Sequence, residues 1–124
     1  MTDTEENYSK AMVVRKLARC PDWGIAEDFI PTGVDVTEQE WSDARASLLG
    51  EWWNIPGRYK FKAIDSTGMR FYYTQRPHIH ESAPYWERAP ESTYYDVWYD
   101  DEYIASEMDI VYWEQSLEKR PYGV

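Results

Sequence analysis

Hydrophobic and polar positions alternate most regularly between residues 58 and 76, in the sequence RYKFKAIDSTGMRFYYTQR. Side chains of an extended strand point alternately to its two faces, so the alternation predicts two strands with one aromatic and one basic face. The aromatic face contains Tyr59, Phe61, Ala63, Phe71 and Tyr73. The basic face contains Arg58, Lys60, Lys62, Arg70 and Arg76, together with Tyr72.

The two strands are separated by Asp-Ser-Thr-Gly at residues 65–68, which is typical of a type I turn with a G1 bulge. Asp65 suits the first position of such a turn, and Gly68 suits its left-handed position. We therefore predict a β-hairpin in which Asp65 pairs with Met69, Ala63 with Phe71, and Phe61 with Tyr73. A slip of one residue would exchange the two faces, so the pattern itself defines the register.

Two helices are predicted before the hairpin. Residues 5–19 have acidic residues in the first turn and basic residues in the last, with a buried stripe expected at Val13, Val14, Leu17 and Cys20. Residues 38–52 follow a capping box, Thr37 to Glu40, and carry Trp41, Ala44, Leu48 and Trp52 at helical spacing. The apolar residues of the loop between them, Trp23, Ile25, Phe29 and Ile30, are expected to be buried.

After the hairpin, the proline-containing stretch 77–92 is expected to be a loop, and YYDVWY at 94–99 a third strand. Residues 102–118 are interpreted as a helix beginning after Asp100 and Asp101, with a strand through MDIVYW as the alternative. The chain is thus expected to be a single α+β domain over residues 1–124. Two N-terminal helices would pack on the aromatic face of a small antiparallel sheet built around the 58–76 hairpin, with a C-terminal helix or further strand.

The formal net charge of −10 is concentrated in one part of the chain. Residues 81–118 contain eleven acidic residues and one basic residue, Arg88, whereas the rest of the chain is neutral overall. The charge repels nucleic acid at long range, so direct nucleic-acid binding by the basic face is not expected. We expect its cations to pair with carboxylates of the C-terminal third.

Carboxylates and large aromatic rings are interleaved in that third. Such a surface suits a basic protein, because carboxylates steer the encounter while aromatic rings form desolvated anchors. The candidate partner-binding residues are Asp96, Trp98, Asp100, Asp101, Glu102, Tyr103, Glu107 and Asp109. We expect a non-catalytic binding protein, in particular an inhibitor of a nucleic-acid-handling protein, in the style of small acidic virus-encoded anti-restriction or anti-CRISPR proteins.

Three alternatives remain open at this stage. The acidic residues can form a merely solvated face over buried aromatic rings. The chain can be a ligand-binding module in which exposed rings such as Trp86, Tyr94 and Trp98 stack on sugars or nucleobases. It can also be a structural subunit of a larger assembly such as a virion.

Catalytic and metal-binding motifs are weak. His78 and His80 point the same way in an extended chain and are the best metal candidates, but a structural zinc site needs four ligands. No phosphate loop, nucleophile elbow or HExxH motif is present. No enzyme activity and no cofactor are expected. The single cysteine, the acidic N-terminus and the lack of a long apolar run favour a cytoplasmic protein without a membrane partner.

Overall fold

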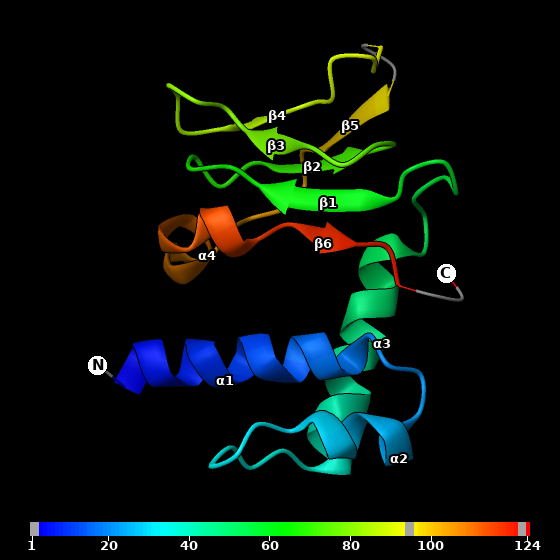
Figure 1. The fold of residues 1–124 in the computed structure, drawn as a ribbon, viewed down its shortest axis with the longest axis vertical. Coiled ribbons are helices and arrows are strands. Elements are labelled where there is room, and N and C mark those ends of the chain that lie inside the picture. Colours follow the sequence, from blue (N-terminus) through cyan, green and yellow to red (C-terminus); the bar gives the residue numbers. More distant parts are fainter. Residues whose placement is uncertain (1–2, 94–95, 122–123) are drawn as a thin grey trace. The chain divides into compact units, whose positions relative to one another are not determined.

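The computed structural model describes residues 3–93, 96–121 and 124, with the backbone alone for residues 3–8. The elements form two compact units, unit 1 (Met1–Ile55 and Pro121–Val124) and unit 2 (Pro56–Arg120). Figure 1 shows helices in unit 1 and mainly antiparallel strands in unit 2. The predicted α+β class is therefore confirmed, whereas the single domain and the packing of helices on the sheet stay predictions.

Unit 1 contains α1 (Asp3–Ala18) and α3 (Glu38–Trp52), which pack on each other. The Trp41 indole donates hydrogen bonds to the carbonyls of Leu17 and Cys20, at 3.0 and 3.2 Å. Arg15 forms an ion pair with Glu51 across the same helix pair. Both predicted helices are therefore confirmed, although Val13 and Cys20 are only half-buried.

The start of α3 depends on the predicted capping box. The Thr37 hydroxyl accepts a hydrogen bond from the Glu40 amide, and the Glu40 carboxylate accepts one from the Thr37 amide. Lys10 contacts the same carboxylate at 2.9 Å, and these partners hold the pKa of Glu40 below its usual value. The capping box thus both begins the helix and ties it to α1.

The connection between α1 and α3 differs from the prediction. It contains a short helix, α2 (Trp23–Ala26), and a 3-10 turn, η1 (Glu27–Phe29). The Asp22 carboxylate starts α2 by accepting a hydrogen bond from the Ile25 amide. Trp23 packs on Trp41, but Ile25 and Phe29 are exposed, so their expected burial was wrong. A single helical turn buries only one side, and in α2 that side belongs to Ala26.

Unit 2 contains a four-stranded antiparallel sheet in the order β5-β2-β1-β6. Its strands are β1 (Phe61–Ile64), β2 (Arg70–Tyr73), β5 (Val97–Asp100) and β6 (Glu118–Lys119). The predicted register of β1 and β2 is confirmed, with Phe61 opposite Tyr73 and Ala63 opposite Phe71. The predicted third strand is confirmed from residue 97 onward, while Tyr94 and Tyr95 lie outside the described residues.

The hairpin turn has the predicted chemistry. The Asp65 amide donates to the Met69 carbonyl, and Gly68 has a φ of 88°, which the left-handed position requires. The Asp65 carboxylate oxygen Oδ1 accepts from the Thr67 amide, the Thr67 hydroxyl and the Met69 amide. Ala105 and Ile110 pack closely over Gly68, so the turn also positions the C-terminal segment.

Two C-terminal predictions were wrong. Residues 77–92 are not only a loop, because β3 (His78–Ile79) pairs with β4 (Trp86–Glu87). Residues 102–118 contain no continuous helix, and MDIVYW is not a strand. They contain α4 (Glu107–Val111), the 3-10 turn η3 (Trp113–Gln115) and then the start of β6.

A second capping box explains the late start of α4. The Ser106 hydroxyl accepts from the Asp109 amide, and the Asp109 carboxylate accepts from the Ser106 amide. Asp100 accepts instead from the Glu102 amide and takes part in a turn. Ser116 then hydrogen-bonds to both the amide and the carbonyl of Ile64, which brings the chain back beside β1.

The sheet is not divided into a buried aromatic face and a solvated basic face. Phe71 and Tyr73 face a pocket whose other wall comes from Tyr85 and Trp86, within unit 2. On the opposite face, Tyr72 is fully buried and Lys62 is 3% exposed. In the described part of the chain, no helix is long and apolar enough to cross a membrane.

Candidate functional site

The candidate acidic residues fall into two sets. In the first set, the carboxylates are used inside unit 2. Asp100 pairs with Arg70, Asp109 caps α4, and Asp96 accepts a hydrogen bond from the Thr93 amide at 2.6 Å. Three of the six acidic residues predicted to bind a partner therefore also have structural contacts.

Arg70 is the centre of the first set. Its Nη2 and Nε lie 2.5 and 3.2 Å from Oδ2 of Asp100, its neighbour across the β2–β5 pair. Its guanidinium carbon lies 3.9 Å from the centre of the Tyr103 ring. The Tyr103 hydroxyl donates to Asp109 at 2.8 Å, so one chain of contacts joins the sheet to α4. Tyr103, predicted as a partner anchor, is half-buried by these contacts.

Lys62 forms the second internal ion pair. Its ammonium lies 2.7 Å from Glu118, which is opposite it on β6. The pairing of basic-face cations with C-terminal carboxylates is thus confirmed for Lys62 and Arg70. Arg58, Lys60 and Arg76 are exposed, and the Arg58 guanidinium lies over the Tyr59 ring. The five cations therefore do not form one continuous basic surface.

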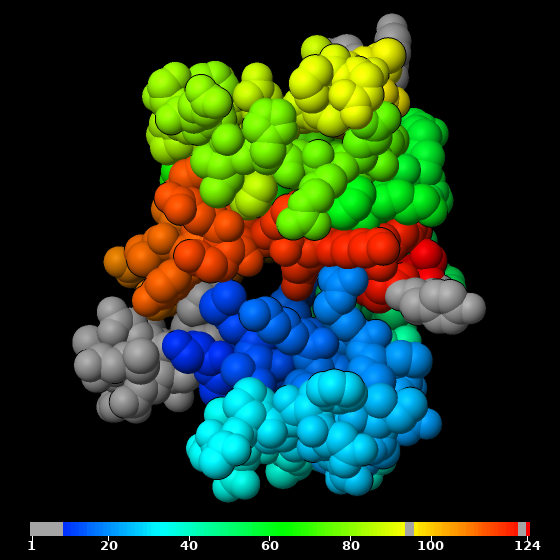
Figure 2. Space-filling view, viewed as in Figure 1, coloured from blue at the N-terminus to red at the C-terminus, as the bar shows by residue number. Residues whose placement is uncertain are grey.

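The second set is Asp101, Glu102 and Glu107, which lie within residues 101–111. We call this range the acidic segment; it also contains Asp109 of the first set. Asp101, Glu102 and Glu107 are exposed, and none of them forms an ion pair with another described residue. The same segment exposes 90% of Ile104 and 60% of Val111. Figure 2 shows this part of the chain, in orange, at one side of unit 2 beside the red β6.

Trp98 is placed differently from the acidic segment. It lies opposite Tyr72 on β5, with the two ring centres 5.4 Å apart, and is 40% exposed. Trp86 lines the pocket on the other face of the sheet and donates from its indole to the Ile64 carbonyl. The predicted row of Trp86, Tyr94 and Trp98 is therefore not a single platform, and Tyr94 lies outside the described residues.

The two candidate metal ligands have separate partners. His78 Nε2 lies 3.2 Å from a Glu87 carboxylate oxygen, across the β3–β4 pair. His80 packs on the Tyr85 ring, and its Nδ1 accepts a hydrogen bond from the Ser82 amide. Across the described ranges, no group of three or more His, Cys, Asp or Glu side chains is arranged to hold a metal ion.

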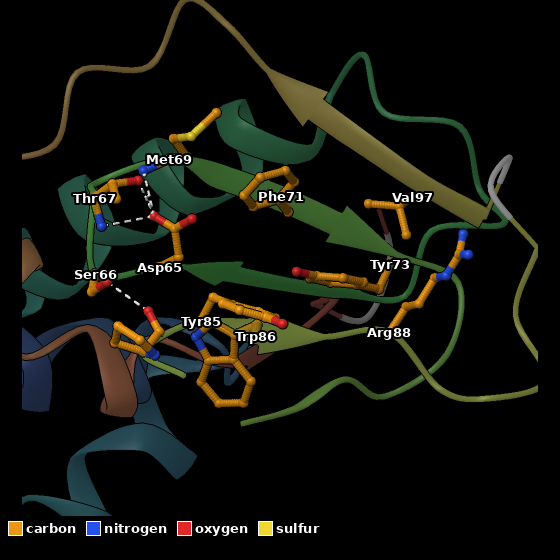
Figure 3. A pocket seen from close by; sticks show the side chains of 11 residues that line it. Asp65, Ser66, Thr67, Met69, Phe71, Tyr73, Tyr85, Trp86, Arg88 and Val97 are labelled. Carbon is orange, nitrogen blue, oxygen red and sulfur yellow. Dashed lines mark hydrogen bonds between the residues drawn. The ribbon is translucent and has the colours of Figure 1, made fainter. Parts of the chain in front are cut away.

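A pocket of about 460 Å³ was not predicted from the sequence. Figure 3 shows its walls, which come from the hairpin, from the start of β5 and from residues 84–88. Its aromatic rings are Phe71, Tyr73, Tyr85 and Trp86, and its other polar side chains are Asp65, Ser66, Thr67 and Arg88. The aromatic face of the hairpin was recognisable in advance, but the return of residues 84–88 over it was not.

Comparison with known proteins adds no functional information: no family model, no curated protein sequence and no solved structure matches this chain.

Proposed function

We propose that this protein is a non-catalytic protein-binding module whose acidic segment binds a basic protein. The observation that carries the proposal is the 90% exposure of Ile104 between exposed carboxylates. An isolated exposed apolar side chain is common on protein surfaces. Here Val111 is also exposed in the same segment, whose exposed charged side chains are all acidic.

The two kinds of side chain have different roles in the proposed complex. Asp101, Glu102 and Glu107 attract a basic surface and accelerate its association at low ionic strength. Ile104 and Val111 supply apolar area that becomes buried only when the partner docks. In the inhibitor form of the proposal, the partner handles nucleic acid. The carboxylates then occupy sites on the partner that nucleic-acid phosphates otherwise fill.

The test uses two variants of the acidic segment. Asp101→Lys/Glu102→Lys reverses the local charge, and Ile104→Asp removes the apolar anchor. Each is compared with an exposed counterpart in unit 1, Glu27→Lys/Asp28→Lys or Phe29→Asp, which makes the same chemical change elsewhere. A partner is captured with the wild-type protein from cells of the natural source, purified, and titrated against all five proteins by calorimetry.

We expect Ile104→Asp to weaken binding by more than about tenfold, as for a central interface residue. The charge-reversed variant should lose both affinity and the salt dependence of association. The two unit 1 variants should bind like the wild type. Equal binding by the wild type and the acidic-segment variants would contradict the proposal. Competition between the chain and DNA or RNA for the purified partner tests the inhibitor form separately.

A further inference from the structure

The pocket in unit 2 has the features of a small-molecule site, separate from the acidic segment. Its volume of about 460 Å³ lies within the usual range for such sites. In Figure 3, Phe71 and Val97 lie on one side and Tyr85 and Trp86 on the other. Aromatic side chains on both sides suit a flat ring, because stacked or edge-on aromatic contacts stabilise both partners.

Two polar side chains that line the pocket each have an oxygen that makes no hydrogen bond with a described residue. Tyr73 is only 4% exposed, and its hydroxyl makes no hydrogen bond with any residue that the structure describes. Asp65 is 9% exposed; its Oδ1 is used by the turn, while its Oδ2 accepts no hydrogen bond from a described residue. Among the described residues, neither oxygen is a fully buried atom that lacks a partner, so both are open to the pocket, where a ligand can hydrogen-bond with them in place of water.

The two groups are a hydrogen-bond donor and an acceptor that line the same pocket. Figure 3 shows the Tyr73 hydroxyl directed toward the turn where the Asp65 carboxylate lies. Burial, and to a lesser extent the negative charge of Asp65, raise the pKa of the Tyr73 phenol. The phenol therefore stays protonated at neutral pH and donates, while the carboxylate accepts. Their complement is a ligand that has both an N–H donor for the carboxylate and a carbonyl oxygen or ring nitrogen that accepts from the phenol.

The opposite end of the pocket has a positive charge. Arg88 lies there, at the end away from Asp65 (Figure 3), and it is exposed. It forms no ion pair within the described ranges, although residues 81–118 contain eleven acidic residues and no other basic one. A guanidinium in this setting is suited to an anionic group, because its fork matches phosphate and carboxylate oxygens.

We propose that this pocket binds a nucleoside monophosphate. The base lies between the aromatic walls, with its hydrogen-bonding edge toward Asp65 and Tyr73. The phosphate, at the other end of the nucleotide, pairs with Arg88. Every nucleobase has both donors and acceptors on its edges, so base preference is measured rather than assumed. This site is independent of the proposed protein-binding function.

The test is a titration of the full chain with AMP, GMP, CMP and UMP, followed by calorimetry and by the indole N–H resonance of Trp86. That proton is hydrogen-bonded to Ile64 at the pocket wall and is assigned with Trp86→Phe. Two variants examine the two ends. Tyr73→Phe removes only the hydroxyl, and Arg88→Gln removes the charge from an exposed position. Arg76→Gln is the matched control, since Arg76 is exposed and does not line the pocket.

We expect at least one nucleotide to shift the Trp86 resonance. Tyr73→Phe and Arg88→Gln should each weaken its binding by about tenfold, and Arg76→Gln should not. The matching nucleoside should bind wild type and Arg88→Gln equally, since it has no phosphate. Thermal melting checks that Tyr73→Phe remains folded. Arg88→Gln tests nucleotide binding at an exposed residue, where the substitution should not disturb the fold.

Three results would overturn the proposal. The first is an unchanged Trp86 resonance at millimolar concentrations of all four nucleotides. The second is equal binding of inorganic phosphate and the nucleotides, which would mean that the rings take no part. The third is nucleotide binding that neither Tyr73→Phe nor Arg88→Gln weakens. A failure here leaves the acidic segment untouched, because none of its residues lines the pocket.

Discussion

The described carboxylates of unit 2 are of two kinds: some form ion pairs within the sheet, and others are exposed without such a pair. Glu118 and Asp100 lie on the sheet beside Lys62 and Arg70, and each forms an ion pair. Asp101 and Glu102 follow Asp100 directly in sequence and are exposed. Neighbouring carboxylates therefore differ because Asp100 lies opposite a cation in the sheet, whereas Asp101 and Glu102 follow the end of the strand.

This difference shows which carboxylates of unit 2 are balanced by an ion pair and which are not. Asp100 and Glu118 are each paired with a cation, whereas the exposed carboxylates of the acidic segment form no ion pair with a described residue and keep their charge at the surface. Charge count along the sequence treats all of these carboxylates alike. The sheet register distinguishes them, because it sets Glu118 opposite Lys62 and Asp100 opposite Arg70.

The largest expected effect comes from breaking the more buried pair. Lys62 is 3% exposed, and Glu118→Ala removes the carboxylate that lies 2.7 Å from its ammonium. We expect the free energy of unfolding to fall by about 3 kcal/mol, as for other buried ion pairs that lose one partner. Urea unfolding followed by circular dichroism measures it.

The double variant Lys62→Met/Glu118→Leu is the matched control for this pair. It removes both charges at similar volume and should unfold within about 1 kcal/mol of the wild type. If Glu118→Ala were as stable as the double variant, burial of the Lys62 ammonium would not require the Glu118 carboxylate.

Arg70→Lys is expected to have an intermediate effect. Lysine keeps the positive charge but loses the planar guanidinium that contacts Asp100 with two nitrogens and lies over Tyr103. We expect a loss of about 1–2 kcal/mol in urea unfolding. Arg76→Lys makes the same exchange at an exposed position and should leave the unfolding free energy unchanged. If the two variants were equally stable, the positive charge of Arg70 would suffice, and its planar guanidinium would add nothing to stability.

The sequence could predict the elements whose signals are local. Alternation and the Asp-Ser-Thr-Gly turn determine the hairpin with its register, and the Thr37–Glu40 capping box determines the start of α3. The same rule could have found the start of α4, since Ser106 and Asp109 have capping-box spacing with Asp in place of Glu. The prediction placed the start of the helix after Asp100 and Asp101 instead, so the predicted helix was too long.

Other features depend on contacts between distant residues. β6 contains two residues and has no strand pattern of its own, yet Ser116 and the Lys62–Glu118 pair hold it beside β1. The pocket depends on Tyr85 and Trp86, which reach the hairpin from a stretch that reads as a loop. The division of the acidic residues into paired and exposed sets follows from these contacts, so composition alone could not give it.

The smallest expected effect concerns the exposed carboxylates themselves. Asp101→Asn/Glu102→Gln changes the net charge from −10 to −8 without breaking an ion pair among the described residues. The unfolding free energy should stay within about 0.5 kcal/mol of the wild type. Asp100→Asn, one residue earlier, removes only one charge but weakens the contact with Arg70 and should lower stability more. Urea unfolding of the two variants at low and high salt makes the comparison. If the double variant were the less stable one, the exposed carboxylates would be structural, which would count against the proposal that they bind a partner.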